Sequence, residues 1–187
     1  MCLKDLTIKN GVLEGARQLK SPNYGQRPPG KGISLLVIHN ISLPPGQFGT
    51  SCVEDFFCNQ LDAESHPSFA DIADLQVSSH LFIKRSGDVT QFVNFNDRAW
   101  HAGVSVFKGV ENCNDFSIGI ELEGTDIIPY TDVQYKVLTY ITRLLIAAYP
   151  LINEQRIVGH CDIAPTRKTD PGPVFDWRRY RQAVWSV

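Results

Sequence analysis

One short apolar run constrains the fold more than any other feature of the sequence. Residues 33–38 (ISLLVI) are almost all branched aliphatic residues, and they end directly before His39 and Asn40. Such a run is typical of a central β-strand that is covered on both faces, because neither face carries charged side chains. Layers on both sides of a strand predict an α/β fold, with one central mixed sheet flanked by helices. We expect His39 and Asn40 at the carboxyl end of this strand.

A second predicted strand carries two carboxylates on one face. Residues 117–123 (SIGIELE) alternate strictly between aliphatic and other residues, and alternate side chains of a strand point to opposite faces of the sheet. This pattern places three aliphatic residues on one face and three other residues on the opposite face: Ile118, Ile120 and Leu122, then Gly119, Glu121 and Glu123.

Capping signals predict two helices. Thr131, with Gln134 three residues later, forms a capping box for a helix that ends before Pro150, and the apolar residues between them recur at helical spacing. Asp176 is expected to cap a terminal helix that runs to about residue 185. The arginines of this second helix, Arg178, Arg179 and Arg181, are interpreted as its solvated face.

Shorter elements are predicted from turn residues and local composition. Residues 77–85 and 88–95 flank Ser86-Gly87 and predict two antiparallel strands of a hairpin. A short helix is expected over residues 52–60, and a last strand over residues 156–158. Residues 21–32 are rich in Pro and Gly, so they predict a loop that enters the domain, with the fold beginning after it.

Size and charge limit the classes of protein that fit. The 187 residues accommodate one domain spanning residues 1–187. The formal net charge of −2 is not the basic charge expected of a nucleic-acid-binding protein. No apolar run has the length of a signal peptide or a membrane helix, so we expect a cytoplasmic protein that does not bind membranes. The five cysteines form no CxxC pair, which fits reduced thiols. We expect a monomer.

Three residues are candidates for a metal site. Catalytic zinc takes three protein ligands and keeps one open position, and imidazole nitrogen and carboxylate oxygen are common donors. His39 follows the buried run, while His160 and Asp170 occur in a proline-rich stretch, GHCDIAPTRKTDPGP. Spacing alone also allows a structural interpretation, in which His39 is a core histidine, His160 a loop histidine and Asp170 a cap before Pro171.

Five ordered blocks carry a family resemblance that favours the metal interpretation. The blocks are VIHN at 37–40, AWHAG at 99–103, NDFSIGIELEG at 114–124, GHCDIAP at 159–165 and RKTDPGP at 167–173. The chain resembles the N-acetylmuramoyl-L-alanine amidase type 2 family from about residue 21 to residue 177. Peptidoglycan recognition proteins and phage amidases are similar in the same blocks, but they often have Cys at the position of Asp170.

The resemblance implies a zinc hydrolase. It makes His39, His160 and Asp170 the ligands of Zn²⁺, with a water in the fourth position whose pKa falls to about 7. The implied reaction is hydrolysis of the lactyl–L-alanine amide in 1,6-anhydro-N-acetylmuramyl peptides, in the cytosolic recycling of peptidoglycan. The anhydro-muramyl peptide is therefore the expected partner.

Two residues are expected to take part in the chemistry. The match to IELEG makes Glu121, rather than Glu123, the general acid and base that moves a proton from water to the leaving nitrogen. Glu123 is interpreted as a surface or supporting carboxylate. Lys168, two residues before Asp170, is expected to place its ammonium near the developing oxyanion.

Substrate contacts are assigned to three residues near these positions. Asn40 and Arg167 flank expected ligands and are candidates for hydrogen bonds to the glycopeptide, while Trp100 offers an apolar face to the sugar or is a core residue. His80 and His101 match no ligand position, so they are interpreted as groups that hydrogen-bond around the metal site. His66 precedes Pro67 in a polar loop and is expected at the surface.

Three alternatives remain beside the leading hypothesis. One is a non-enzymatic protein with a structural zinc, although three ligands with an open fourth position suit catalysis better. A lytic amidase would act on intact cell wall rather than on small anhydro-muropeptides. A peptidoglycan-binding sensor would keep the fold without hydrolysis, although such proteins typically lose a ligand and all three candidates are present here.

Overall fold

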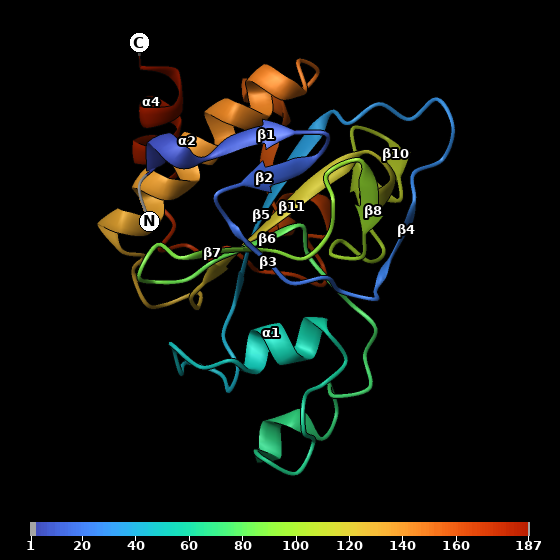
Figure 1. The fold of residues 1–187 in the computed structure, drawn as a ribbon, viewed down its shortest axis with the longest axis vertical. Coiled ribbons are helices and arrows are strands. Elements are labelled where there is room, and N and C mark those ends of the chain that lie inside the picture. The colour runs from blue at the N-terminus through green and yellow to red at the C-terminus, as the bar shows by residue number, and fades with distance from the viewer. Residues whose placement is uncertain (1–2, 187) are drawn as a thin grey trace.

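A computed structural model describes residues 3–186 and contains one central sheet with helices around it (Figure 1). The helices are α1 (Cys52–Phe57), α2 (Asp132–Ala148), α3 (His160–Ile163) and α4 (Trp177–Trp185), and short 3-10 helices span Leu3–Asp5, Pro67–Phe69, Cys113–Asp115 and Glu154–Arg156. The strands are β1 (Thr7–Lys9), β2 (Val12–Glu14), β3 (Arg17–Gln18), β4 (Tyr24–Gln26), β5 (Leu35–Ile41), β6 (Leu81–Ile83), β7 (Val89–Gln91), β8 (Asp97–Ala99), β9 (Val106–Phe107), β10 (Val110–Glu111), β11 (Ser117–Glu123) and β12 (Ile157–Gly159).

The central sheet is mixed, as the sequence predicts. Its strand order is β12-β5-β11-β6-β7-β3, and the four strands from β12 to β6 are parallel to one another. The β6–β7 pair is antiparallel, which confirms the predicted hairpin, and β3 then pairs with β7 in parallel. The α/β class with one central sheet is therefore confirmed.

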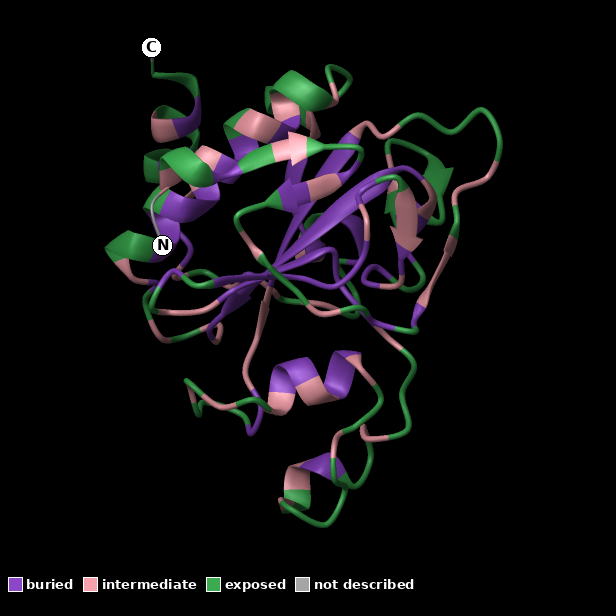
Figure 2. Ribbon diagram, in the orientation of Figure 1, coloured by how far each residue is buried: buried purple, intermediate pink, exposed green. Residues whose placement is uncertain are grey.

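The two faces of the sheet have different partners. In β5, Leu36 and Ile38 belong to the main core together with residues of α2, whereas Leu35 and Val37 pack with residues such as Ile163 of α3. The central strands are buried and the rim of the molecule is exposed (Figure 2). His39 has the parity of Leu35 and Val37, so its side chain lies on the α3 face of the sheet.

Parallel pairing places Glu121 beside His39. The register of β11 on β5 sets Glu121 opposite His39, and cross-strand partners in register point to the same face. The aliphatic residues of β11 lie in the core with α2, as the alternation predicts, and all seven residues of the strand are buried. The face of β11 that carries Glu121 is therefore enclosed by other parts of the protein.

Helix α2 forms as its capping signals predict. Thr131 accepts a hydrogen bond from the backbone nitrogen of Gln134, and the Gln134 side chain accepts one from the backbone of Thr131. Helix α4 begins after Asp176, whose side chain accepts from the backbone nitrogen of Arg179.

Glycine at position 87 has φ of +88° in the turn between β6 and β7, a conformation that residues with side chains disfavour.

The expectation that the fold begins after residues 21–32 is wrong. Strands β1, β2 and β3 precede that segment, and β4 lies within it. Leu6 and Leu13 are fully buried, and the Gln91 side chain accepts from the Leu13 nitrogen and donates to the Gly11 carbonyl. Strands of two or three residues are too short to show a periodic pattern, so they could not be predicted from the sequence.

Several predicted boundaries also differ from the structure. The hairpin strands predicted over residues 77–85 and 88–95 are shorter, at Leu81–Ile83 and Val89–Gln91. Strand β5 continues to Ile41, so His39 lies inside the strand rather than after it. Helix α1 ends at Phe57, three residues before the predicted end. His160 is the first residue of α3 and does not lie in a loop.

Among residues 3–186, no helix is long and apolar enough to cross a membrane. The four cysteines in this range are free, and Cys2 lies outside the described residues.

An ion pair between the buried Glu54 carboxylate and the partly exposed Lys84 connects α1 to the sheet. Glu54 of α1 is 3% exposed, and its carboxylate lies 2.6 Å from the ammonium of Lys84, which follows β6. Lys84 also donates to the Thr50 carbonyl. The pair therefore joins the segment before α1, the helix and the end of β6.

Replacing Lys84 with Met is expected to destabilise the protein by up to about 3 kcal/mol, because it leaves the buried Glu54 carboxylate with only the exposed guanidinium of Arg17, 3.7 Å away. Urea denaturation measures the change. The double variant Lys84→Met, Glu54→Gln is expected to be more stable than Lys84→Met alone, since it removes the buried charge. Equal stability of Lys84→Met and the wild type would show that the pair contributes nothing.

Candidate metal centre and active site

Three donor atoms from distant parts of the chain form a small triangle on the α3 face of the sheet. Nδ1 of His39 lies 3.0 Å from Nδ1 of His160 and 3.0 Å from Oδ2 of Asp170. Nδ1 of His160 lies 3.2 Å from the same carboxylate oxygen. The structure thus brings together the three residues that the sequence analysis proposed as ligands, from β5, from α3 and from the loop after α3.

The size of this triangle fits a tetrahedral ion. Bonds of about 2.0–2.1 Å to zinc place tetrahedral donors about 3.3 Å apart. The observed separations of 3.0–3.2 Å are close to that value. Two imidazole nitrogens and one carboxylate oxygen are also donors that zinc accepts, and they leave one coordination position open. The donor set therefore suits a catalytic zinc rather than a closed structural one.

The second ring nitrogen of each histidine has its own partner. Nε2 of His160 lies 3.1 Å from the Ala102 carbonyl oxygen, to which it donates. Nε2 of His39 lies 3.0 Å from Nδ1 of His101. Hydrogen bonds at Nε2 leave Nδ1 of each ring free for a metal. Burial also lowers the pKa of His39 to about 4, which keeps its ring neutral near pH 7.

The loop that carries Asp170 is held at several points. The backbone nitrogen of Cys161 donates to the Asp170 carbonyl, and the Tyr130 hydroxyl donates to the carbonyl of Pro171. Burial acts to raise the pKa of the Asp170 carboxyl, but the adjacent imidazoles of His160 and His39 outweigh burial and hold the pKa below its usual range. Asp170 is therefore present as the carboxylate that a metal requires.

Glu121 lies beside the triangle with an unused oxygen. Its Oε1 is 3.9 Å from Nδ1 of His39, and its Oε2 is buried with no hydrogen-bond partner within residues 3–186. Burial and the charge of Asp170 raise the pKa of Glu121 well above its usual value, while the nearby Lys168 opposes this shift. A raised pKa brings a carboxyl group closer to the range in which it both accepts and donates a proton during catalysis.

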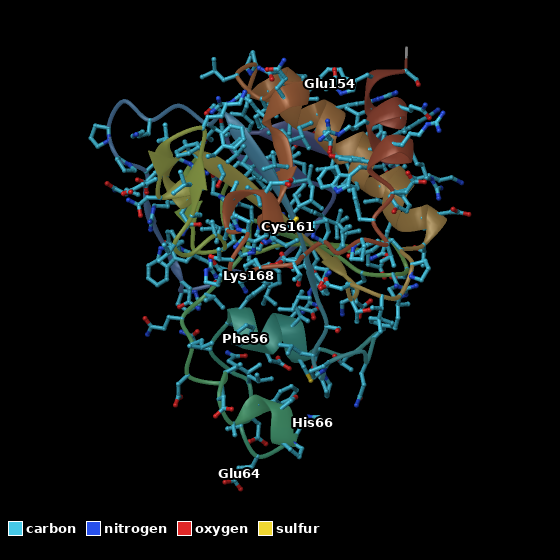
Figure 3. The ribbon with its side chains drawn as sticks, turned by 180° about the vertical axis from the view of Figure 1, so that it is seen from behind. Phe56, Glu64, His66, Glu154, Cys161 and Lys168 are labelled. Carbon is cyan, nitrogen blue, oxygen red and sulfur yellow. The ribbon has the colours of Figure 1, made fainter. Side chains whose placement is uncertain are left out.

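The triangle opens into a cleft of about 550 Å³ between the sheet and α1. Its lining includes the metal candidates, Glu121 and Lys168 on one side, and Phe56 and Phe57 of α1 on the other. In Figure 3, Lys168 lies between Cys161 of α3 and Phe56 of α1. One wall of the cleft is therefore polar and charged, and the opposite wall is apolar.

The proposed substrate residues all line this cleft, but two of them also have partners in the protein. The Asn40 side chain donates to Asp126, and Arg167 donates to the carbonyls of Ala102 and Val104. Trp100 is half-buried and lines the cleft, and its indole nitrogen is buried with no hydrogen-bond partner within residues 3–186. Asn40 and Arg167 therefore shape the cleft whether or not they touch a substrate.

The other polar residues considered in the sequence occupy distinct positions. Glu123 is 3% exposed and accepts hydrogen bonds from the backbone nitrogens of Gly49 and Arg85, so it is a buried anchor away from the triangle. His80 is fully buried, and its Nδ1 accepts from the Gly119 nitrogen. His66 caps a short 3-10 helix near the surface.

Sequence reasoning missed the part played by Gly119. A Cβ at this position would lie 2.5 Å from the ring of His101, so only glycine leaves room for that ring. A glycine inside a strand often marks the close approach of another group. The interruption of SIGIELE by glycine was therefore an available signal.

The fold and the site together define a class of protein, an α/β domain with a candidate two-histidine, one-aspartate metal centre. A family model described as N-acetylmuramoyl-L-alanine amidase matches residues 28–173. The chain belongs to the N-acetylmuramoyl-L-alanine amidase family. It is accordingly an enzyme, and the resemblance seen in the five sequence blocks is confirmed.

Individual relatives extend the similarity over nearly the whole chain. The 1,6-anhydro-N-acetylmuramyl-L-alanine amidase AmpD of Haemophilus influenzae is 56% identical over 177 residues, which are 95% of this chain and 96% of that protein. A crystal structure of a selenomethionine AmpD derivative, 54% identical, superposes with a TM-score of 0.93 over 96% of this chain and 99% of the other.

A more distant solved structure contains a ligand. It is the complex of the amidase AmiD from Escherichia coli with the substrate anhydro-N-acetylmuramic acid-L-Ala-D-gamma-Glu-L-Lys. The two chains are 32% identical, with a TM-score of 0.59 over 96% of this chain and 66% of the other. A fold of this kind thus accommodates an anhydro-muramyl peptide in that protein.

Proposed function

We propose that this protein is a zinc-dependent amidase that hydrolyses the lactyl–L-alanine bond of 1,6-anhydro-N-acetylmuramyl peptides. The observation that carries the zinc chemistry is the triangle of donors at 3.0–3.2 Å with the Glu121 carboxyl beside it. The substrate class rests on the 56% identity to an enzyme whose name specifies the anhydro-muramyl amide.

Zinc, held by His39, His160 and Asp170, would supply Lewis acidity to the amide carbonyl and lower the pKa of a water in the open position. Glu121 accepts the proton of the attacking water on its unpartnered oxygen. The same carboxyl group then donates that proton to the amide nitrogen, because an amine leaves far more readily than an amide anion. Its raised pKa suits both steps.

Lys168 completes the charge arrangement. Its ammonium lies in the same cleft and is close enough to Glu121 and His39 to affect their pKa values. A fixed positive charge in a site shielded from water stabilises an oxyanion more strongly than it does in bulk solvent. We assign Lys168 to the oxygen of the carbonyl as it becomes tetrahedral.

Substrate positioning is assigned to the cleft walls. Trp100 offers its ring to the sugar, and Asn40 and Arg167 offer polar groups at the rim nearest the metal candidates. The apolar wall of α1 limits which groups fit opposite them. The reaction would belong to the cytosolic recycling of peptidoglycan, a location that cell fractionation tests directly, and size-exclusion chromatography tests the expected monomer.

The decisive assay compares two substrates. Protein loaded with one equivalent of zinc is incubated with an anhydro-muramyl tripeptide and, separately, with intact cell wall, and released peptide is measured by mass spectrometry. We expect rapid release from the anhydro-muramyl tripeptide. Activity confined to intact wall would instead identify a lytic amidase, and no cleavage of either substrate by the zinc-loaded protein would identify a binding protein.

A further inference from the structure

The two histidines of the metal triangle differ in what their second ring nitrogen contacts. A ligand histidine commonly donates this N–H to a carboxylate, a backbone carbonyl or a water. His160 follows this rule through the Ala102 carbonyl. His39 instead contacts another imidazole, with 3.0 Å between its Nε2 and Nδ1 of His101. The two rings meet edge to face, at an interplanar angle of 83°.

His101 is itself held on three sides. Its Nε2 lies 3.1 Å from the Ser117 hydroxyl, and its backbone nitrogen donates to the side chain of Asn114. Its ring covers Gly119, where a Cβ would approach to 2.5 Å. Only 9% of His101 is exposed. The imidazole ring of His101 is therefore held in one position in the folded protein. Two of its contacts, Ser117 and Gly119, belong to β11, the strand that also carries Glu121.

These contacts permit a single direction of donation that is compatible with a metal. If His39 donates from Nε2 to Nδ1 of His101, then His101 carries its hydrogen on Nε2 and donates to the Ser117 oxygen. Nδ1 of His39 is then a lone pair that faces His160 and Asp170. The reverse direction would place a hydrogen on Nδ1 of His39, at the centre of the triangle, where it would exclude a metal.

We propose that His101 is a positioning residue of the metal centre: it accepts the Nε2 hydrogen of His39 and so presents Nδ1 of His39 to the metal. Gly119 is required because the ring of His101 occupies the space of its Cβ. The inference rests on the proposed zinc site, and it assigns to His101 a specific hydrogen bond rather than a place in the cleft wall.

A matched pair of substitutions isolates this hydrogen bond. His101→Asn and His101→Leu have nearly the same shape, and both vacate the far half of the ring. The amide oxygen of Asn can take the place of Nδ1 as an acceptor, whereas Leu has none. We expect His101→Leu to weaken zinc binding by about 10- to 100-fold, and His101→Asn to stay near the wild-type affinity. The zinc dissociation constant is measured by competition with a chromophoric chelator.

A second variant displaces the ring without changing its chemistry. Gly119→Ala adds a methyl group that must push His101 away, so we expect a loss of zinc affinity similar to that of His101→Leu. Ser79→Ala is the control, because Ser79 donates to the carbonyl of the same glycine at 2.8 Å while the bond between His101 and Ser117 stays in place. Ser79→Ala is expected to bind zinc with wild-type affinity.

Spectroscopy and stability distinguish positioning from a structural role. In cobalt-substituted protein without substrate, we expect altered visible bands for His101→Leu and Gly119→Ala and wild-type bands for His101→Asn. Thermal unfolding of the metal-free proteins shows how far each variant is destabilised. If His101→Leu keeps wild-type zinc affinity and cobalt bands, or if His101→Asn loses as much affinity as His101→Leu, the proposal is wrong. A wild-type protein that binds no zinc would instead contradict the proposed function itself.

Discussion

Glu121→Gln is expected to lower kcat by about 10²- to 10⁴-fold while zinc remains bound, because the amide of Gln neither accepts the proton of the attacking water nor delivers one to the leaving nitrogen. The substitution preserves the size of the side chain and does not touch the three metal candidates. Steady-state kinetics on an anhydro-muramyl peptide, with zinc content measured on the same samples, tests the expectation.

Glu123→Gln is the matched control for this variant. Glu123 lies two residues further along the same strand face and is also buried, but its oxygens accept from the backbone of Gly49 and Arg85. The control should therefore lose stability, by about 1–3 kcal/mol for a poorly satisfied buried group, and keep its kcat. A Glu121→Gln enzyme with nearly wild-type kcat would remove Glu121 from the mechanism.

Asp170→Ala is expected to abolish activity through loss of the metal. Only two protein ligands remain in this variant. Loss of a residue that hydrogen-bonds a ligand typically lowers metal affinity by about 10- to 100-fold, and loss of a ligand itself should lower zinc affinity by more. Dialysis followed by elemental analysis measures the zinc retained. The removal of zinc from the wild type by a chelator should have the same effect on activity, and added zinc should restore it.

Asp170→Cys provides the rescue. Zinc binds thiolate as readily as carboxylate, with a bond of about 2.3 Å to sulfur. We expect the Cys variant to retain one equivalent of zinc under dialysis conditions that strip the Ala variant. Zinc bound at one equivalent to Asp170→Ala would show that Asp170 is not a ligand.

Parts of the site could be predicted because they depend on local patterns. The alternation in β11 placed Glu121 and Gly119 on one face, and the aliphatic run of β5 placed His39 at a buried position. The capping box of α2 could also be predicted from the sequence, since it involves two residues that are three positions apart. Patterns of this kind need no knowledge of tertiary structure.

The convergence of the donors could not be derived from local patterns. His160 and Asp170 lie 121 and 131 residues from His39 in the sequence, and only the pairing of β12 with β5 brings them close. The five family blocks supplied this information through resemblance. The contact between His39 and His101, across 62 residues, had no local signal beyond the glycine that accommodates it.

The N-terminal strands were missed for a different reason. The strands β1, β2 and β3 contain two or three residues each, and they are held by the Gln91 side chain and by the burial of Leu6 and Leu13. Their stability comes from tertiary contacts rather than from their own propensity. A reading based on periodicity therefore assigned the segment to a region outside the fold.

The in-register pairing of β5 with β11 has a consequence for how such an enzyme can diversify. The spacing of His39 and Glu121 is determined by backbone hydrogen bonds between two buried strands, whereas the opposite wall of the cleft comes from α1 and the irregular segment that follows it. Substitutions that remodel this wall leave the spacing of His39 and Glu121 unchanged. The shape of the cleft can therefore vary independently of the proposed catalytic atoms.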